Sequence, residues 1–182
     1  MAREPDNVVH GLLREILAKQ SEVTRAMSSI HIAQLNIGRF LHPTDDPRMA
    51  GFTDNLDRIN AMAERSEGFV WRLKDDSGNA TAIRPFPDPT MAVNLSVWES
   101  VEALEKFVWN TVHSRIYNGK GAWFEKMATP HLVMWGVPAG HIPSLEEAKA
   151  RLDHLTQFGD SDHAFGWSHL PHVRLWMNKK CG

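Results

Sequence analysis

The stretch Ile30–Ile37 (IHIAQLNI) interleaves apolar residues with polar ones and ends at Gly38. Such interleaving over a short run predicts a β-strand with one apolar and one mixed face. A similar run, Met91–Val97 (MAVNLSV), lies further along the chain. These two stretches decide the fold prediction because each carries uncharged polar residues inside an apolar strand: Gln34 and Asn36 in the first, Asn94 and Ser96 in the second.

The segments between these strands complete the predicted topology. Apolar residues three or four apart predict helices over 51–65, from Ser100 onward and from Ser144 onward. Phe69–Leu73 and His131–Val137 predict two further strands. The order strand, helix, strand, strand, helix, strand is typical of an α+β, ferredoxin-like βαββαβ antiparallel sheet. In that topology the first and third strands are the central pair, so their polar residues would share one face.

A polar face at the centre of a sheet needs either a partner or a wet cavity. Two helices cover only one face of a four-stranded sheet, so we expect the other face to meet a second copy of the chain. The sequence therefore predicts a homodimer of the dimeric α/β-barrel type.

The domain organisation expected is one compact domain with two extensions. Residues 1–27 would form an N-terminal helical extension, 28–167 the α/β domain and 168–182 a C-terminal tail.

The formal charge of −2 and the lack of a basic run argue against nucleic-acid binding. No apolar run approaches a membrane span, and the N-terminus lacks a secretory signal pattern, so we expect a cytoplasmic protein without a membrane partner.

Four blocks of sequence resemble one bacterial family. They are SVWESVEALEKFVWNTVH (Ser96–His113), AWFEK (Ala122–Lys126), VMWGVPAGHIPSLEEAKARLDHL (Val133–Leu155) and AFGW (Ala164–Trp167). In order and spacing they look like the domain-of-unknown-function 3291 family (DUF3291), which is grouped with dimeric α/β-barrel proteins that include antibiotic-biosynthesis-type monooxygenases. The resemblance implies the fold more specifically than the chemistry, because that superfamily holds oxygenases, isomerases, cyclases and haem-dependent enzymes.

One departure from the family pattern concerns anion binding. Family members carry a basic stretch between the helix histidine and the Trp–Phe pair, whereas this chain has Asn118-Gly119-Lys120-Gly121. The resemblance therefore implies either that anionic groups held by arginines in relatives do not bind here or that this loop is more mobile.

The candidate site residues follow from an unusual content of seven Trp and ten His. Indoles with a few polar groups are typical walls of small-molecule pockets. His113 lies one helical turn after Trp109 at a position that the family matches, so it is the candidate for proton transfer; a core histidine bonded to a backbone carbonyl is the alternative. Asn36 and Asn94 are candidates for stabilising oxygen charge. The predicted substrate contacts are Trp71, Trp109, Trp123, Phe124, His131, Trp135 and Arg84. Core packing is the alternative for the Trp side chains and His131, and a solvated guanidinium is the alternative for Arg84.

Metal and nucleotide sites are not predicted. His163, His169 and His172 lie near the C-terminus, but no metal-ligand spacing accompanies them, and no phosphate-binding or Gly-x-Ser-x-Gly motif occurs. We therefore expect an enzyme of the monooxygenase, isomerase or cyclase type, without a nucleotide cofactor, acting on a largely apolar, aromatic or polyketide-like metabolite. The alternative is a non-catalytic protein that holds haem or an apolar ligand in the same cavity.

Overall fold

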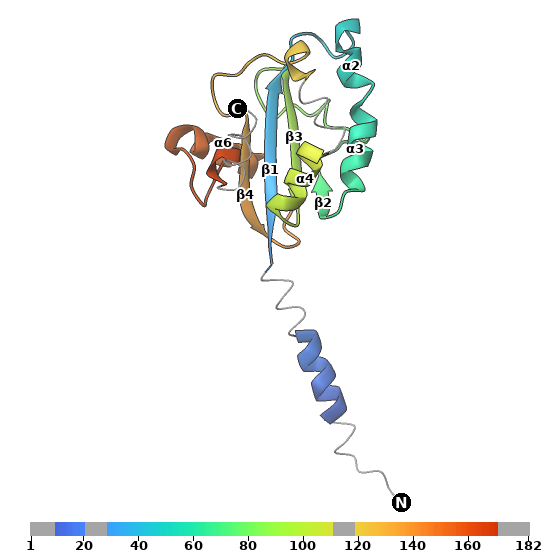
Figure 1. Cartoon of the computed structure of the whole chain (residues 1–182), viewed down its shortest axis with the longest axis vertical. Helices are drawn as coiled ribbons and strands as arrows, with labels where there is room; N and C mark the ends of the chain where they lie inside the picture. The colour runs from blue at the N-terminus through green and yellow to red at the C-terminus, as the bar shows by residue number, and fades with distance from the viewer. Residues whose placement is uncertain (1–9, 21–28, 111–118, 171–182) are drawn as a thin grey trace, which may run out of the picture.

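The computed structural model describes residues 10–20, 29–110 and 119–170, and it shows a mixed α+β fold (Figure 1). Its centre is a four-stranded sheet in the order β2-β3-β1-β4, in which every neighbouring pair is antiparallel. The strands are β1 (Ile30–Arg39), β2 (Phe69–Arg72), β3 (Met91–Trp98) and β4 (Leu132–Pro138).

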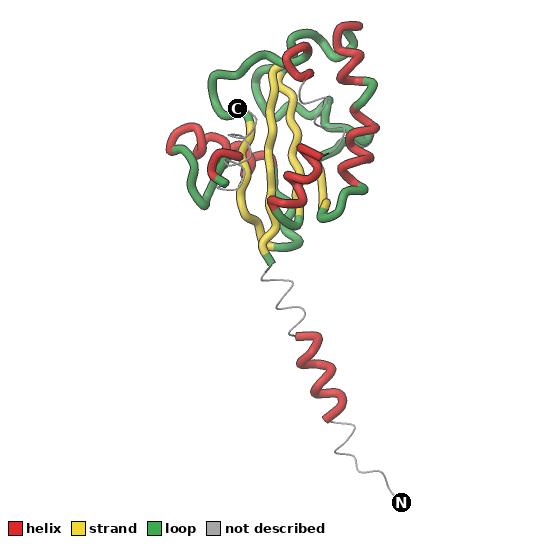
Figure 2. Tube along the Cα trace, viewed as in Figure 1, coloured by secondary structure: helices red, strands yellow, loops and turns green. Residues whose placement is uncertain are grey.

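Helices connect and flank these strands (Figure 2). Residues 10–20 are helical. The remaining helical elements are η1 (Pro47–Met49), α2 (Ala50–Thr53), α3 (Leu56–Glu64), α4 (Val101–Asn110), η2 (Lys120–Ala122), α6 (Leu145–Phe158) and η3 (Trp167–His169).

The pairing of β1 with β3 confirms that the two polar stretches are adjacent. Gln34 lies opposite Ser96, and Asn36 lies opposite Asn94. Because directly opposed residues of an antiparallel pair share a face, all four polar side chains lie on one side of the sheet.

The polar face of the sheet is also the face that α3 and α4 cover. Trp98 and Met134 belong to this face, and they form one buried core with Ala63 of α3 and with Leu104 and Phe107 of α4. We refer to this cluster as the α4 core. Figure 1 shows α4 in front of the central strands. The polar residues therefore lie on the helix-covered side of the sheet.

The opposite face is apolar and packs against a further helix of the same chain. A second cluster, the α6 core, joins the three longer strands to α6 and to the segment around Phe86; its buried members include Leu35, Leu95, Val133, Trp135, Ala148 and Leu152. The expectation that only two helices pack on the sheet is therefore wrong. The physical reason is the apolar stripe of α6, which adds a third layer. The homodimer stays a prediction.

Local signals in the sequence place the starts of α4 and α6 correctly. Ser144 caps α6, with its hydroxyl accepting from the Glu147 backbone N–H at 3.1 Å, and Ser100 accepts in the same way from Ala103 at 3.2 Å. The helix predicted over 51–65 is instead divided into α2 and α3. The later part of the helix expected after Ser100 lies outside the described residues.

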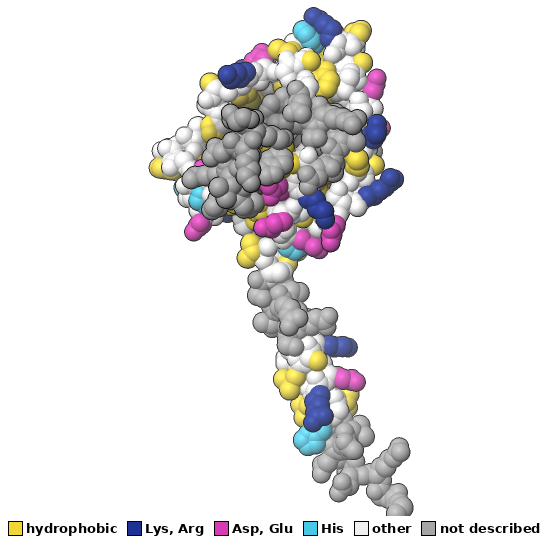
Figure 3. All heavy atoms as spheres, viewed as in Figure 1, with side chains coloured by type: hydrophobic (Ala, Val, Ile, Leu, Met, Phe, Trp, Pro, Cys, Tyr) yellow, Lys and Arg dark blue, Asp and Glu magenta, His cyan; other side chains and the backbone are white. Residues whose placement is uncertain are grey.

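The helix at residues 10–20 presents its apolar side chains to solvent. Leu12, Leu13, Ile16 and Leu17 have exposed fractions of 54%, 49%, 53% and 61%. Figure 3 shows apolar side chains beside charged ones on this helix, which lies away from the sheet. Within the described ranges, no helix is long and apolar enough to cross a membrane.

Ser96 is the common acceptor of two buried donors, which makes it a test of the fold. Its hydroxyl accepts from Gln34 Nε2 at 3.0 Å and from Trp98 Nε1 at 2.9 Å, and all three residues are buried. We expect Ser96→Ala to lower the free energy of unfolding by about 1–3 kcal/mol, because both donors lose their acceptor. Urea denaturation measures this loss.

The matched control is Ser100→Ala, which removes a helix cap and is expected to cost about 1 kcal/mol. A loss for Ser96→Ala clearly below about 1 kcal/mol would contradict the role assigned to this hydroxyl.

Candidate functional site

The candidate site centres on two carboxamides in the middle of the sheet. Asn36 is half-buried on β1, and Asn94 is exposed on β3, although both strands are central. Within the described part of the chain, neither carboxamide makes a hydrogen bond to another side chain. The two amides therefore keep donors and acceptors that no side chain of the described residues uses, and these are available to solvent or to a ligand.

The next polar pair along the same strands behaves differently. Gln34 and Ser96 are bonded to each other and are each 5% exposed. They lie next to the α4 core, because Ser96 also accepts from Trp98. The polar face therefore has two parts. In the closed part, Gln34 and Ser96 are buried and hydrogen-bonded to each other. In the open part, Asn36 and Asn94 are less buried.

An aromatic cluster stands beside the open part. It consists of Phe40, Phe52, Trp123 and Phe124, whose neighbouring ring centroids are 5.1–6.2 Å apart. Phe124 lies against Gly38, where a Cβ atom would come within 2.6 Å of its ring. Because Gly38 and Asn36 are two residues apart on β1, they share a face, and Phe124 borders the carboxamides.

Backbone bonds hold this cluster on the end of β1. Phe40 and Phe124 form an isolated antiparallel bridge. The Leu41 N–H donates to the Trp123 carbonyl, and the Glu125 N–H donates to the Arg39 carbonyl, each at 2.9 Å. The segment 123–125 therefore continues the strand pairing at the end of β1 and sets the Phe124 ring against the polar face.

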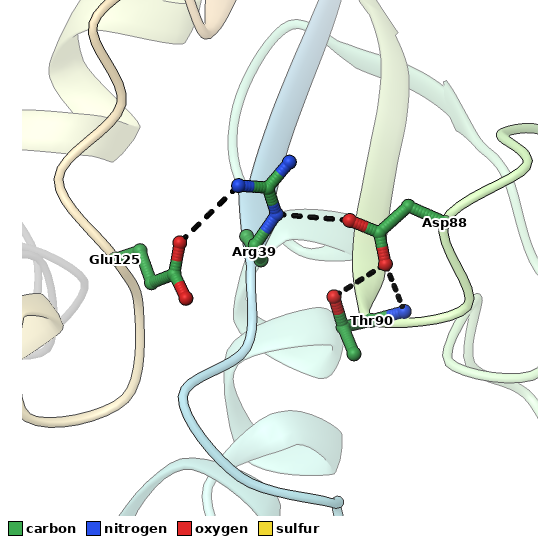
Figure 4. Close-up of polar contacts among 4 residues, drawn as sticks. All are labelled: Arg39, Asp88, Thr90 and Glu125. Carbon is green, nitrogen blue, oxygen red and sulfur yellow. Dashed lines mark hydrogen bonds and ion pairs between the residues drawn. The ribbon is translucent and has the colours of Figure 1, made fainter.

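Two ion pairs of Arg39 lie at the same end of β1 (Figure 4). Arg39 contacts Asp88 Oδ2 at 2.9 Å and Glu125 Oε2 at 3.3 Å, so one guanidinium joins the end of β1 to two loops. The pKa of Asp88 is held below its ordinary value, first by hydrogen bonds from the Thr90 side chain and backbone and then by Arg39. This carboxylate remains charged at neutral pH and keeps the loop before β3 attached to β1.

The structure distributes the other predicted site residues over several places. Trp71 and Trp135 belong to the α6 core on the opposite face of the sheet. His131 precedes β4, and its carbonyl accepts from the Ile37 N–H at 2.9 Å. Trp109 packs with the α4 core, where its ring centroid is 6.0 Å from that of Trp167.

Two further candidates are not placed with the carboxamides. Arg84 is exposed in the loop before β3, and its guanidinium donates to the carbonyls of Thr81 and Ile83. His113 lies outside the described residues. Of the predicted residues, Phe124 borders the strand that carries Asn36, Trp123 belongs to the same aromatic cluster through Phe52, and Trp71 and Trp135 lie on the opposite face of the sheet.

Glu147 of α6 is a partly buried carboxylate that the sequence analysis does not single out. It accepts from the buried Trp135 indole at 2.9 Å and contacts His141 Nε2 at 2.8 Å. Burial alone would raise the pKa of Glu147, but the hydrogen bonds from His141 and Trp135, together with the charges of His141 and Arg151, lower the pKa. Its place three residues after the capping Ser144 is the available signal, and that signal indicates a helix start more than a site.

A metal ion needs several His, Cys, Asp or Glu side chains arranged around one point. Among those that the structure describes, no group of three or more His, Cys, Asp or Glu is arranged to hold a metal ion.

Comparison with known proteins decides the family. The model of the family described as "Domain of unknown function (DUF3291)" matches residues 31–180. The chain belongs to the DUF3291 family. No curated protein matches this DUF3291 protein. Among solved structures, it is similar to the NE2512 protein of unknown function from Nitrosomonas europaea, with 11% identity over 64% of this chain and 97% of the other and a TM-score of 0.42.

In this DUF3291 protein, replacement of a carboxamide without a side-chain hydrogen bond should affect stability differently from replacement of a bonded one. We expect Asn94→Val to leave the free energy of unfolding unchanged or to raise it by up to about 1 kcal/mol, because no side-chain hydrogen bond is lost and valine favours strands. Gln34→Leu, on the same face, should destabilise the protein because it breaks the bond to Ser96. Thermal denaturation of both variants checks the contrast, and equal destabilisation would refute it.

A substitution at Gly38 tests the contact between β1 and the Phe124 ring. The added methyl of Gly38→Ala would lie 2.6 Å from Phe124 Cδ1, so the ring must move, at a cost of about 1–3 kcal/mol. Near-ultraviolet circular dichroism should change together with the melting temperature. Gly121→Ala is the control, because a Cβ atom there meets nothing within 4 Å. Identical behaviour of the two variants would show that the Phe124 contact is unimportant.

Proposed function

We propose that this DUF3291 protein binds a small, largely apolar metabolite that presents a carbonyl or phenolic oxygen to Asn36 and Asn94, and that it converts this molecule by oxygenation, isomerisation or cyclisation. The observation that carries the proposal is the open carboxamide pair on the two central strands. Asn94 is exposed and Asn36 half-buried, so both amides can exchange water for a bound molecule, and their place on the two central strands supports a ligand site there.

The chemistry of a carboxamide suits an oxygen-bearing ligand. Each amide offers two N–H donors and one carbonyl acceptor, so the pair can donate to one substrate oxygen from both strands. The paired strands fix the backbone positions of both residues, and amide donors directed at the oxygen on which charge develops favour enolates and related transition states. The rings of Phe124 and Trp123 supply the apolar contact that a flat or aromatic substrate requires.

Proton transfer in the proposed reaction is assigned to His113. The described part of α4 reaches Asn110, shortly before this residue in the sequence. A neutral imidazole at an apolar wall is a suitable general base near pH 7. Binding depends on the carboxamides and the rings, whereas turnover depends on the histidine, so the two parts of the proposal are separable.

The alternative is a non-catalytic protein that holds haem or another apolar ligand at the same place. The carboxamides and the aromatic cluster favour it equally, because they explain binding without a proton-transferring group. A Soret band after haem addition would support this alternative.

We also infer a ferredoxin-like arrangement, supported by the strand order β2-β3-β1-β4 and by helices after β1 and β3. The homodimeric barrel rests on the family resemblance, since α6 already packs on the second face of the sheet.

Native mass spectrometry of the protein purified from cells tests these proposals together. We expect a retained small molecule on the wild type and its loss from Asn94→Val, because an apolar side chain cannot donate to the ligand oxygen. The exposed Asp153→Asn on α6 serves as the control and should keep the ligand. The same spectrum gives the subunit number, and a monomer would contradict the dimer.

The isolated ligand then serves as the substrate in a product assay. His113→Ala should bind it but lose turnover by about a hundredfold or more, as expected for removal of a general base. Unchanged turnover would reject the role of His113, and equal retention of the ligand by Asn94→Val would reject the site itself.

A further inference from the structure

The chain that follows α6 returns to the sheet and pairs with its outer edge. We refer to residues 159–170 as the strap. The Met134 N–H donates to the Phe165 carbonyl at 2.7 Å, and the Phe165 N–H donates to the Met134 carbonyl at 2.9 Å. Since β1 pairs with the other side of β4, the strap occupies the outer edge of this strand. Figure 1 shows the end of the described chain beside β4.

The strap also contributes to both cores. Ala164 is fully buried in the α6 core, and Phe165 is buried in the α4 core. Trp167 packs against the α4 core and against the Trp109 ring. Release of the strap would therefore uncover apolar surface on both faces of the sheet and free the backbone of Met134.

A guanidinium on α6 fastens the strap. Arg151 Nη1 lies 2.8 Å from the His163 carbonyl and 2.6 Å from His163 Nδ1. A guanidinium is always protonated and can only donate, so His163 Nδ1 must be the unprotonated acceptor. The contact with Nδ1 exists only while the imidazole is neutral.

The groups that face His163 from α6 make its protonation unfavourable. Arg151 is in direct contact, and the His154 ring centroid is 4.6 Å from that of His163. A proton on the His163 imidazole would therefore place one cation against another.

The carboxylates of the strap are engaged with other partners. Asp160 accepts from the Gly166 N–H at 2.8 Å and from the Ser168 hydroxyl at 3.1 Å. Asp162 lies 3.9 Å from His169 Nε2. The charged groups that act on His163 are Arg151 and His154.

The surroundings of His163 lower the pKa of its imidazole, in agreement with its contact with Arg151. Partial desolvation, then Arg151 and His154, hold the pKa of His163 below its ordinary value of 6.5. A histidine whose pKa is lowered in the closed state binds a proton more tightly when the strap is open. The stabilisation of the closed strap is therefore complete above pH 6.5 and declines as the pH falls through the lowered value.

We propose that His163 and Arg151 form a pH-sensitive latch, in which protonation of the exposed His163 breaks the Nδ1 contact with Arg151, leaves the bond to the His163 carbonyl, and shifts the strap toward release from α6 and from the edge of β4. Both imidazole nitrogens then carry hydrogens, so Nδ1 can no longer accept and two cations face each other. This conformational device is independent of the proposed ligand site.

Hydrogen exchange of the Met134 and Phe165 amides tests the latch on the full chain. Their exchange rates, corrected for intrinsic chemistry, should rise severalfold between about pH 7.5 and about pH 5, the range in which histidines titrate. Amides in the centre of β1 report global unfolding and should keep their protection. An unchanged corrected rate at Met134 and Phe165 would overturn the proposal.

Variants distinguish the effect of His163 titration from the effects of other titrating groups. His163→Gln keeps a hydrogen-bond acceptor but cannot titrate, so its strap amides should show no acceleration in acid. Arg151→Met removes the contact altogether, and its strap amides should exchange rapidly at both pH values. His169→Gln is the matched control on the same strap and should keep the wild-type pH response. Retention of that response by His163→Gln, or its loss from His169→Gln, would contradict the assignment to His163.

Discussion

The antiparallel pairing of β1 with β3 is the constraint on which the rest of the structure depends. It sets Asn36 opposite Asn94 and Gln34 opposite Ser96, and it places the apolar residues of the alternate positions on the other face. A shift of one residue would exchange the two faces. The buried bonds of Ser96 to Gln34 and Trp98 oppose such a shift, so a small polar network specifies the register of the sheet.

The same polar face combines a structural part with a part that the fold leaves unused. Near Trp98, α3 and α4 close over satisfied groups, whereas at Asn36 and Asn94 the sheet keeps two amides without partners among the described side chains. The aromatic cluster at the end of β1 lies at this boundary, held by the backbone of 123–125 and by Arg39. A rigid scaffold that carries unused polar groups is the usual arrangement at functional sites, where local stability is given up for binding.

The second face shows how a chain can cover both sides of its own sheet. The apolar stripe of α6 packs on this face, and the strap returns to the edge of β4. Pairing at the edge also occupies backbone donors and acceptors that would otherwise favour association with other chains. Because the strap contacts α6 through a histidine and Arg151, this protection is tied to the protonation state of one imidazole.

The sequence by itself determined the four strands, the adjacency of the central pair, the capped starts of α4 and α6 and the family, because alternation, caps and motif blocks are local signals. Only the tertiary structure decided that α6 adds a third layer and that Trp71 and Trp135 lie on the opposite face from Asn36 and Asn94. For Trp71 the cause is a bulge between Phe69 and Trp71, which changes the face that the indole meets. Such features depend on contacts between residues far apart in the chain, and the amino-acid types within a single segment carry no record of them.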